Sequence, residues 1–83
     1  MFDDIYILIP VFNESEKIGN VISELKKYFK NIIVVNDGSS DNSLEILKKY
    51  KIKTLSHSHN LGQGAAISTG LRYIKSKKNA YAA

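Results

Sequence analysis

The chain has 83 residues, a net charge of +4 and no cysteine. This length allows one small domain, and the lack of cysteine excludes disulfides and thiolate metal sites and favours a reducing, cytoplasmic compartment. No apolar run approaches the ~20 residues that span a bilayer, and Asp3 and Asp4 stand where a signal peptide needs basic residues. Nucleic-acid binding is not expected, because the lysines form no stripe with interleaved aromatic residues. They are scattered along the predicted helices, which favours solvated helix faces over a polybasic membrane-binding segment.

The first strand, loop and helix are predicted near the start of the chain. The apolar run 5–9 predicts a strand that is covered on both faces. Asn13, with Glu16 three residues later, predicts a capping box at the start of a helix. The residues that follow at helical spacing predict its buried face: Ile18, Val21, Ile22, Leu25 and Phe29.

Two more units of the same kind follow. Residues 31–35 predict the second strand, and Ser40 or Asp41 is expected to cap the next helix. Residues 53–56 predict a weaker third strand. A third helix is expected over about 64–75, and its apolar residues predict the inward face: Ile67, Leu71 and Ile74.

The alternation of strands and helices predicts a Rossmann-like, three-layer α/β/α fold with a parallel sheet. Residues 1–83 are expected to be a single, partial domain, because Tyr81 to Ala83 look like the opening of a fourth strand. An unpaired sheet edge would then be exposed, and self-association through it is expected. The first two loops leave the same edge of the sheet, which is where open α/β sheets bind ligands.

The first two loops carry acidic and amide side chains. Glu14 accepts hydrogen bonds when ionised and suits a sugar hydroxyl, or else Asn13 and Glu14 only cap the helix. Asp37 can accept a hydrogen bond from a ring N–H of a base or from ribose, and Gly38 allows a close backbone approach. The alternative for this loop is a plain turn and helix cap.

The loop before the third helix is rich in small residues, which let a backbone approach phosphates at a helix N-terminus. Gly62 and Gly64 form only part of a dinucleotide fingerprint, because Ile67 stands where the third glycine belongs. His57 and His59 would share a face if the third strand continued, and could then bind a metal. Two surface histidines at a strand end are the simpler interpretation.

Together, three segments resemble family 2 glycosyltransferases of the GT-A fold. They are Ile-Pro-Val-Phe-Asn-Glu at 9–14, Val-Asn-Asp-Gly-Ser-Ser-Asp at 35–41, and Asn-Leu-Gly-Gln-Gly-Ala-Ala at 60–66, followed by Gly70. The third segment looks like the branch that contains dolichyl- and polyprenyl-phosphate sugar synthases. The similarity covers essentially the whole chain. One departure is Asn36, where the family has aspartate; asparagine keeps an acceptor oxygen but loses the charge.

The resemblance implies the N-terminal, nucleotide-binding half of a GT-A domain: three βα units and the start of a fourth strand. The full-length protein would be an inverting glycosyltransferase that moves a sugar from a UDP- or GDP-sugar donor to an acceptor such as a polyprenyl phosphate, at the cytoplasmic membrane face. The resemblance assigns the nucleotide-sugar site to Pro10, Val11, Phe12, Asn13, Glu14, Asn36, Asp37, Ser39, Asn60, Gly62 and Gly64.

The resemblance also implies which parts of the enzyme lie elsewhere. The family's metal-binding Asp-x-Asp motif and its catalytic base do not occur in these 83 residues. No catalytic or metal-binding residue is therefore expected in this chain, and the fragment is expected to be inactive by itself. Mg²⁺ or Mn²⁺ would be held by the full-length enzyme, where it neutralises charge on the donor diphosphate.

The alternative is a stand-alone nucleotide-binding or regulatory α/β module without catalysis. Coding sequence that continues beyond Ala83 would refute it. A receiver-type signalling domain fits less well, because it needs an acidic pair after the first strand and an aspartate at the end of the third. The chain has Ile9 and Pro10 at the first position and His57 at the second.

Overall fold

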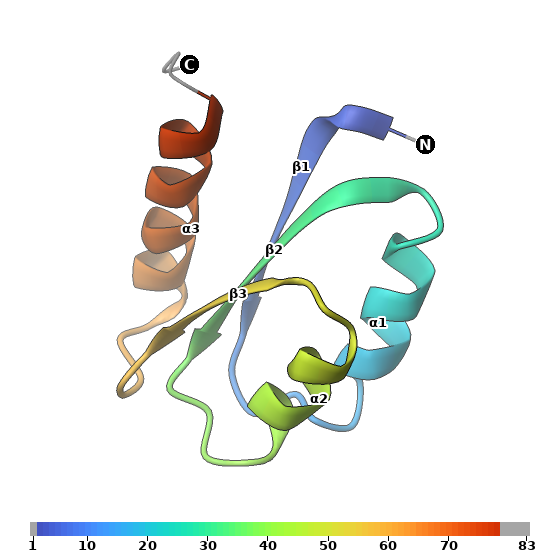
Figure 1. Ribbon diagram of the computed structural model, residues 1–83. Coiled ribbons are helices and arrows are strands. Elements are labelled where there is room, and N and C mark those ends of the chain that lie inside the picture. The colour runs from blue at the N-terminus through green and yellow to red at the C-terminus, as the bar shows by residue number, and fades with distance from the viewer. Residues whose placement is uncertain (1, 79–83) are drawn as a thin grey trace.

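The computed structural model describes residues 2–78, and over that range three strands alternate with three helices (Figure 1). The elements are β1 (Phe2–Val11), α1 (Ile18–Leu25), β2 (Phe29–Asp37), α2 (Ser43–Lys49), β3 (Lys53–His57) and α3 (Gln63–Lys78). The strands are parallel and lie in the order β1-β2-β3. The predicted α/β class is thus confirmed, whereas the expected fourth strand at Tyr81 lies outside the described residues.

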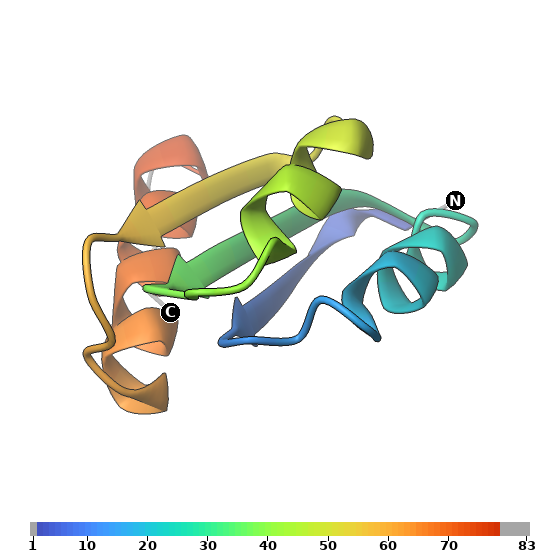
Figure 2. The ribbon, with the colours of Figure 1, turned by 90° about the horizontal axis from the view of Figure 1, so that it is seen from below.

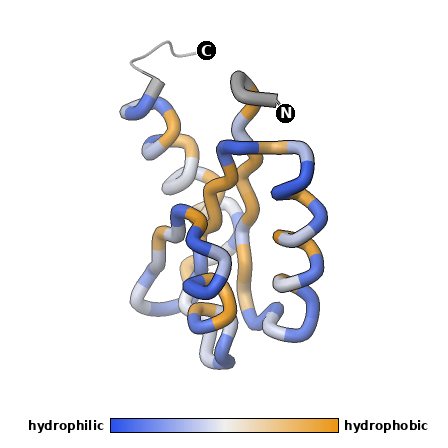
Figure 3. Tube along the Cα trace, turned by 45° about the vertical axis from the view of Figure 1, so that its right-hand side comes forward, coloured by the Kyte–Doolittle hydropathy of each residue, from blue (hydrophilic) through white to orange (hydrophobic). Residues whose placement is uncertain are grey.

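Helices cover both faces of the sheet. Figures 1 and 2 show α1 and α2 on one side and α3 on the other. Successive residues of a strand point to opposite faces, so β2 serves both layers: Ile32 and Val34 belong to the cluster with Ile22 and Leu47 from α1 and α2. The intervening residues of β2 face α3. This double cover explains why β1 and β2 contain continuous apolar runs, which Figure 3 shows along the centre of the molecule.

Helix α1 is shorter than predicted. It ends at Leu25, and Phe29 is the first residue of β2, where it pairs with Phe2 of β1. The prediction that Phe29 lies on the buried face of the first helix was therefore wrong, because residues 26–28 form a turn and the chain then continues as a strand. Val21, also assigned to the buried face, is exposed. The capping box was wrong as well: the N-cap is Lys17, and its side chain makes no capping bond.

Helix α3 approaches the sheet through its smallest residues. Ala66 and Gly70 are buried, whereas Ile67 and Leu71, which were predicted to face inward, are exposed. A Cβ at position 70 would collide with the side chain of Leu8 on β1, so glycine allows this approach without a shift of that leucine. Ile74, the third residue predicted to face inward, is partly buried. The prediction was therefore wrong for Ile67 and Leu71, because α3 contacts the sheet most closely through its small side chains.

The register brings the carboxyl ends of the strands together. Val11 of β1 pairs with Asn36 of β2, and Asp37 pairs with His57 of β3. The three loops that follow these strands therefore leave the sheet at one edge, as predicted for the first two. β1 lies at the side of the sheet in the described range and carries the exposed Ile5; self-association through that side stays a prediction.

Candidate functional site

An open hollow of about 410 Å³ lies where the three loops meet at the carboxyl edge of the sheet. It is lined by Pro10, Val11, Phe12, Glu14, Asp37, Asn60, Gly62, Gln63 and Ala66. All of these except Gln63 and Ala66 are residues that the family resemblance assigned to the nucleotide-sugar site. The other assigned residues (Asn13, Asn36, Ser39 and Gly64) do not line it. The fold thus places most of the predicted residues around one concave surface.

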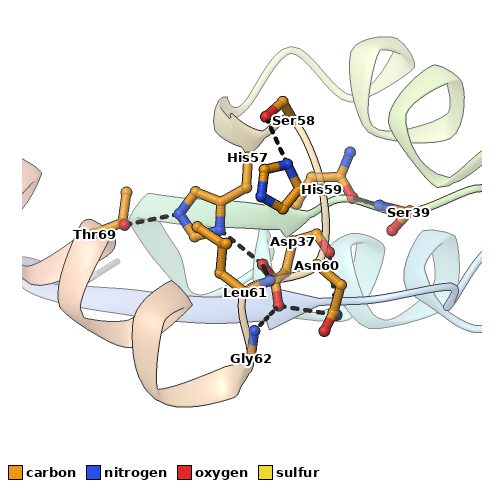
Figure 4. Close-up of polar contacts among 10 residues, drawn as sticks. Asp37, Ser39, His57, Ser58, His59, Asn60, Leu61, Gly62 and Thr69 are labelled. Carbon is orange, nitrogen blue, oxygen red and sulfur yellow. Dashed lines mark hydrogen bonds and ion pairs between the residues drawn. The ribbon is translucent and has the colours of Figure 1, made fainter.

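Asp37 centres a hydrogen-bond network on the α3 side of this hollow, and we call it the Asp37 network (Figure 4). One carboxylate oxygen, Oδ1, accepts from Nδ1 of His57 at 2.7 Å and from the backbone N–H of Leu61 at 2.9 Å. The other, Oδ2, accepts from the backbone N–H of Gly62 at 2.9 Å and from Nδ2 of Asn60 at 3.1 Å. The network ties the end of β2 to the end of β3 and to the loop before α3.

This network keeps Asp37 ionised although its side chain is buried. The hydrogen bond from His57 and the backbone N–H groups of Leu61 and Gly62 lower the pKa of Asp37, and they outweigh the opposing effect of burial. Four donors meet the carboxylate, which is about the number of lone-pair positions that it offers. The predicted contact between Asp37 and a nucleotide base stays a prediction, and it requires one of these donors to give way.

Asn13 centres a second network, the Asn13 network, which joins the first loop to the second. Its side-chain oxygen accepts from the backbone N–H groups of Ser40 at 2.8 Å and Asp41 at 3.3 Å. Its own backbone N–H donates to the hydroxyl of Ser39 at 3.0 Å. Asn13 adopts a positive φ of 53°, which asparagine tolerates better than most residues. The side chain that was predicted to cap α1 is therefore used to hold the neighbouring loop.

Asp41 extends this second network toward α2. Its carboxylate accepts from the backbone N–H of Ser15 at 3.1 Å, and from both the hydroxyl and the backbone N–H of Ser43. The Ser43 hydroxyl in turn accepts from the backbone N–H of Glu14. These donors, the Ser43 hydroxyl first, lower the pKa of Asp41 to about 2. The N-cap of α2 is Asn42 rather than Ser40 or Asp41, yet the Asp41 carboxylate still satisfies a first-turn N–H of that helix.

Asn36 and Gly38 shape the turn between the two networks. Asn36 is buried, and its side-chain oxygen accepts from the backbone N–H of Ser39 at 3.4 Å. An asparagine at this position therefore still supplies the acceptor that orders the loop. Gly38 has a φ of +69°, and a Cβ there would collide with the backbone of His59 and Asn60. The second and third loops can touch only because this residue is glycine.

His57 is the residue that sequence reasoning misplaced. It was interpreted as a surface histidine, but its side chain is only 12% exposed and lies between Asp37 and Thr69 of α3. His59 turns away, is exposed and contacts the hydroxyl of Ser58. The only signal in the sequence was that both residues follow predicted strands; the register that pairs Asp37 with His57 is seen only in the structure. Within the described part of the chain, no group of three or more His, Asp or Glu side chains is arranged to hold a metal ion.

A second hollow, of about 560 Å³, lies at the opposite edge of the sheet, beside the starts of β2 and β3. Its lining includes lysines that are scattered in the sequence but gathered by the fold: Lys26, Lys30, Lys51, Lys53 and Lys77. All of them are exposed to solvent, as predicted for the scattered lysines other than Lys53, although Lys30 and Lys53 lie in strands and not on helices. The ammonium groups of Lys53 and Lys77 lie 5.3 and 5.6 Å from the ring centre of Tyr73. Over the described residues, no helix is long and apolar enough to cross a membrane.

Comparison with known proteins identifies related sequences. The model of the family "Glycosyl transferase family 2" matches residues 6–82. An uncharacterized protein of Methanocaldococcus jannaschii is 44% identical over 71 residues, which cover 84% of this chain and 29% of that protein. A UDP-N-acetylglucosamine–dolichyl-phosphate N-acetylglucosaminyltransferase of Methanococcus voltae is 35% identical, over 82% of this chain and 34% of its own length. A dolichyl-phosphate beta-glucosyltransferase of Trichomonas vaginalis is also 35% identical, over 76% of this chain and 23% of its own length. The chain thus spans about a quarter to a third of these relatives.

Proposed function

This chain belongs to glycosyl transferase family 2, and on that premise we propose that it forms the nucleotide-sugar-binding part of an inverting glycosyltransferase. Residues 1–83 would be one partial domain of that enzyme. The donor is a UDP- or GDP-sugar. The acceptor is a polyprenyl phosphate presented at the cytoplasmic face of a membrane, a proposal supported by relatives that are named as dolichyl-phosphate sugar transferases.

The observation that carries this proposal is the hollow at the carboxyl edge of the sheet. Its lining combines an aromatic ring, an exposed carboxylate and small loop residues, which suit a base, a ribose and a diphosphate in turn. Phe12 is 46% exposed and offers its ring for stacking on the base. Glu14 offers acceptor oxygens to the ribose hydroxyls. Gly62 and Asn60 form the wall that faces them, close to the start of α3.

In this proposal Asp37 has two tasks. Its carboxylate orders the loop before α3 through Leu61 and Gly62. When a base enters, a ring N–H replaces the side-chain amide of Asn60, which makes the longest of the four contacts described for the carboxylate. Asn13, Asn36 and Ser39 act from behind the hollow by holding the first two loops together.

The transfer step belongs to the whole enzyme. An acceptor oxygen would attack the anomeric carbon of the sugar while the nucleoside diphosphate leaves, and this single displacement inverts the configuration. Members of this family commonly use a divalent metal ion, and the described residues of this chain include no group of side chains arranged to hold one. We therefore assign this chain to donor binding and place no step of the transfer on its residues.

The test is a titration of the chain with UDP, GDP and their sugars, followed by amide NMR. Saturable shifts are expected at Phe12, Glu14 and Gly62, and the preferred nucleotide identifies the base. Phe12→Ala is expected to weaken binding about tenfold, because it removes a stacking surface. Tyr28→Ala is the matched control, since Tyr28 is also an exposed aromatic residue but lies in the turn before β2. The proposal would be contradicted if the spectrum is dispersed, so that the chain is folded, and no added nucleotide changes the chemical shifts.

A further inference from the structure

His57 is a partly buried histidine with both ring nitrogens engaged. It ends β3, and its ring lies between the Asp37 carboxylate and the Thr69 hydroxyl of α3 (Figure 4). Nδ1 lies 2.7 Å from Oδ1 of Asp37, and Nε2 lies 2.8 Å from Oγ1 of Thr69. The contacts join the last residues of two strands to the middle of a helix. Neither the sequence motifs nor the roles proposed above use this residue.

The chemistry of its partners fixes how the ring is protonated. An ionised carboxylate only accepts hydrogen bonds, so Nδ1 of His57 must carry a proton in order to contact Asp37. The Thr69 hydroxyl can donate to a neutral Nε2 or accept from a protonated one. The ring can therefore keep the same position in either charge state. Its Nδ1–H toward Asp37 is the constant part of the arrangement.

The ring controls the loop before α3 through the carboxylate. Oδ1 of Asp37, which accepts from His57, also accepts from the backbone N–H of Leu61, and Oδ2 accepts from that of Gly62. If the carboxylate turned about its χ2 angle, both backbone bonds would lengthen. The His57 ring, held by Thr69 on its far side, is placed to prevent that rotation. Gly62 in turn lines the hollow.

From this geometry we propose that His57 is a positioning residue of the donor site. It fixes the rotation of the Asp37 carboxylate and, through it, the Leu61–Gly62 backbone that forms one wall of the hollow. The consequence for ligand binding rests on the proposed function, whereas the consequence for the loop does not. His57 touches no ligand in this role and acts only through Asp37.

Two substitutions distinguish the role of Nδ1 of the His57 ring from that of Nε2. The side-chain nitrogen of asparagine lies near the position of Nδ1, and that of glutamine reaches near Nε2. His57→Asn is therefore expected to keep the donor to Asp37, and His57→Gln to lose it. Amide hydrogen exchange at Leu61 and Gly62 should rise about tenfold in His57→Gln and stay within about threefold in His57→Asn. His59→Gln, at an exposed ring outside the network, is the matched control and should change neither amide.

The ligand experiment repeats this comparison with UDP and GDP. His57→Gln should weaken binding of the preferred nucleotide about tenfold, whereas His57→Asn should keep most of the affinity of the unsubstituted chain. Nitrogen NMR of the unsubstituted protein should find the His57 proton on Nδ1, a signature that packing alone does not produce. Thr69→Val keeps the shape of the side chain but removes its hydroxyl. It should raise amide hydrogen exchange at Leu61 and Gly62 less than His57→Gln does.

The outcomes are distinct. The role of His57 would be overturned if amide exchange at Leu61 and Gly62 were unchanged in His57→Gln, or if it rose equally in both His57 variants. It would also be overturned if the His57 proton were found on Nε2 only. If the glutamine variant fails to fold, the proton position in the unsubstituted protein and the Thr69→Val exchange data still decide. If the unsubstituted chain binds neither UDP nor GDP, the proposed function fails, while the exchange and nitrogen data continue to test His57.

Discussion

The two networks at the carboxyl edge of the sheet hold neighbouring loops by different means. The Asp37 network is built on a carboxylate that is 3% exposed and that accepts from two backbone N–H groups. The Asn13 network is built on a neutral, exposed amide. Charge-assisted bonds in a buried site are stronger than neutral bonds in contact with water. The Asn13 network also includes the Asp41 carboxylate, which bonds the Ser15 N–H of the first loop, but Asp41 is only partly buried. We therefore expect the wall before α3 to be held more firmly than the wall formed by the first loop.

The largest effect is expected at Gly38, which lies between the two networks. Gly38→Ala places a Cβ at positive φ and against the backbone of the third loop. We expect a loss of about 2 kcal/mol or more in the free energy of unfolding, measured with urea. Gly64→Ala is the control, because its Cβ would meet no atom within 4 Å. That change should be neutral or stabilise α3 by up to ~1 kcal/mol, and equal losses in the two variants would contradict the account.

The Asn13 network is tested by two substitutions at its centre. Asn13→Gly removes the acceptor for Ser40 and Asp41 but permits the positive φ, and should cost about 1 kcal/mol. Asn13→Ala removes the acceptor and adds backbone strain, and should cost about 1 kcal/mol more. Urea unfolding of both variants separates the two contributions. A glycine variant as stable as the unsubstituted chain would show that the hydrogen bonds of this network contribute nothing.

Acid is expected to weaken both networks. The pKa of Asp41 falls from its usual 3.8 to about 2, and that of Asp37 is lowered too. A carboxyl whose pKa is lower in the folded state adds stability above its unfolded pKa, and the fold loses this stability as the pH falls through the folded value. The free energy of unfolding should thus decline between pH 4 and pH 2. Asp41→Asn should flatten this decline, and parallel pH curves for the variant and the unsubstituted chain would refute the assignment.

The smallest effect is expected at Ser39. Its hydroxyl accepts the Asn13 N–H at an exposed position, so Ser39→Ala should cost no more than about 1 kcal/mol. Ser58→Ala, at an exposed serine of the third loop, is the control and should change stability by less than ~0.5 kcal/mol. A larger loss in the free energy of unfolding for Ser39→Ala than for Asn13→Ala would contradict this ranking of contacts within the Asn13 network.

The order of the elements could be predicted, because each depends on local patterns. Apolar runs marked the strands, and Gly38 marked a turn that the structure keeps, whereas Pro10 lies inside β1 and pairs with Val35 of β2. The inward face of α3 could not be predicted from Ile67 and Leu71. That face depends on how closely the helix approaches β1, which is a property of packing between distant segments and not of helical spacing.

The candidate site was predictable in outline for the same reason. Loops that follow parallel strands meet at one edge, and the family resemblance assigned Phe12, Glu14 and Gly62 to a site there; all three line the hollow. The partners of Asn13 and Asp37 could not, because both side chains bond to distant backbone N–H groups, which every loop residue except proline offers. Only the register of β2 and β3, which depends on the assembled sheet, brings His57 to Asp37.

The contact between Gly70 and Leu8 has a consequence for how this sequence can vary. A methyl group at position 70 would overlap the Leu8 side chain, so the two positions form one packing unit on α3 and β1. In relatives with a larger residue at 70, we expect a smaller one at 8. In a double-mutant cycle, Gly70→Ala should be better tolerated when Leu8 is also alanine than when it is leucine. The width of the gap between helix and strand is thus set jointly by two residues far apart in the chain, and selection should act on them as a pair.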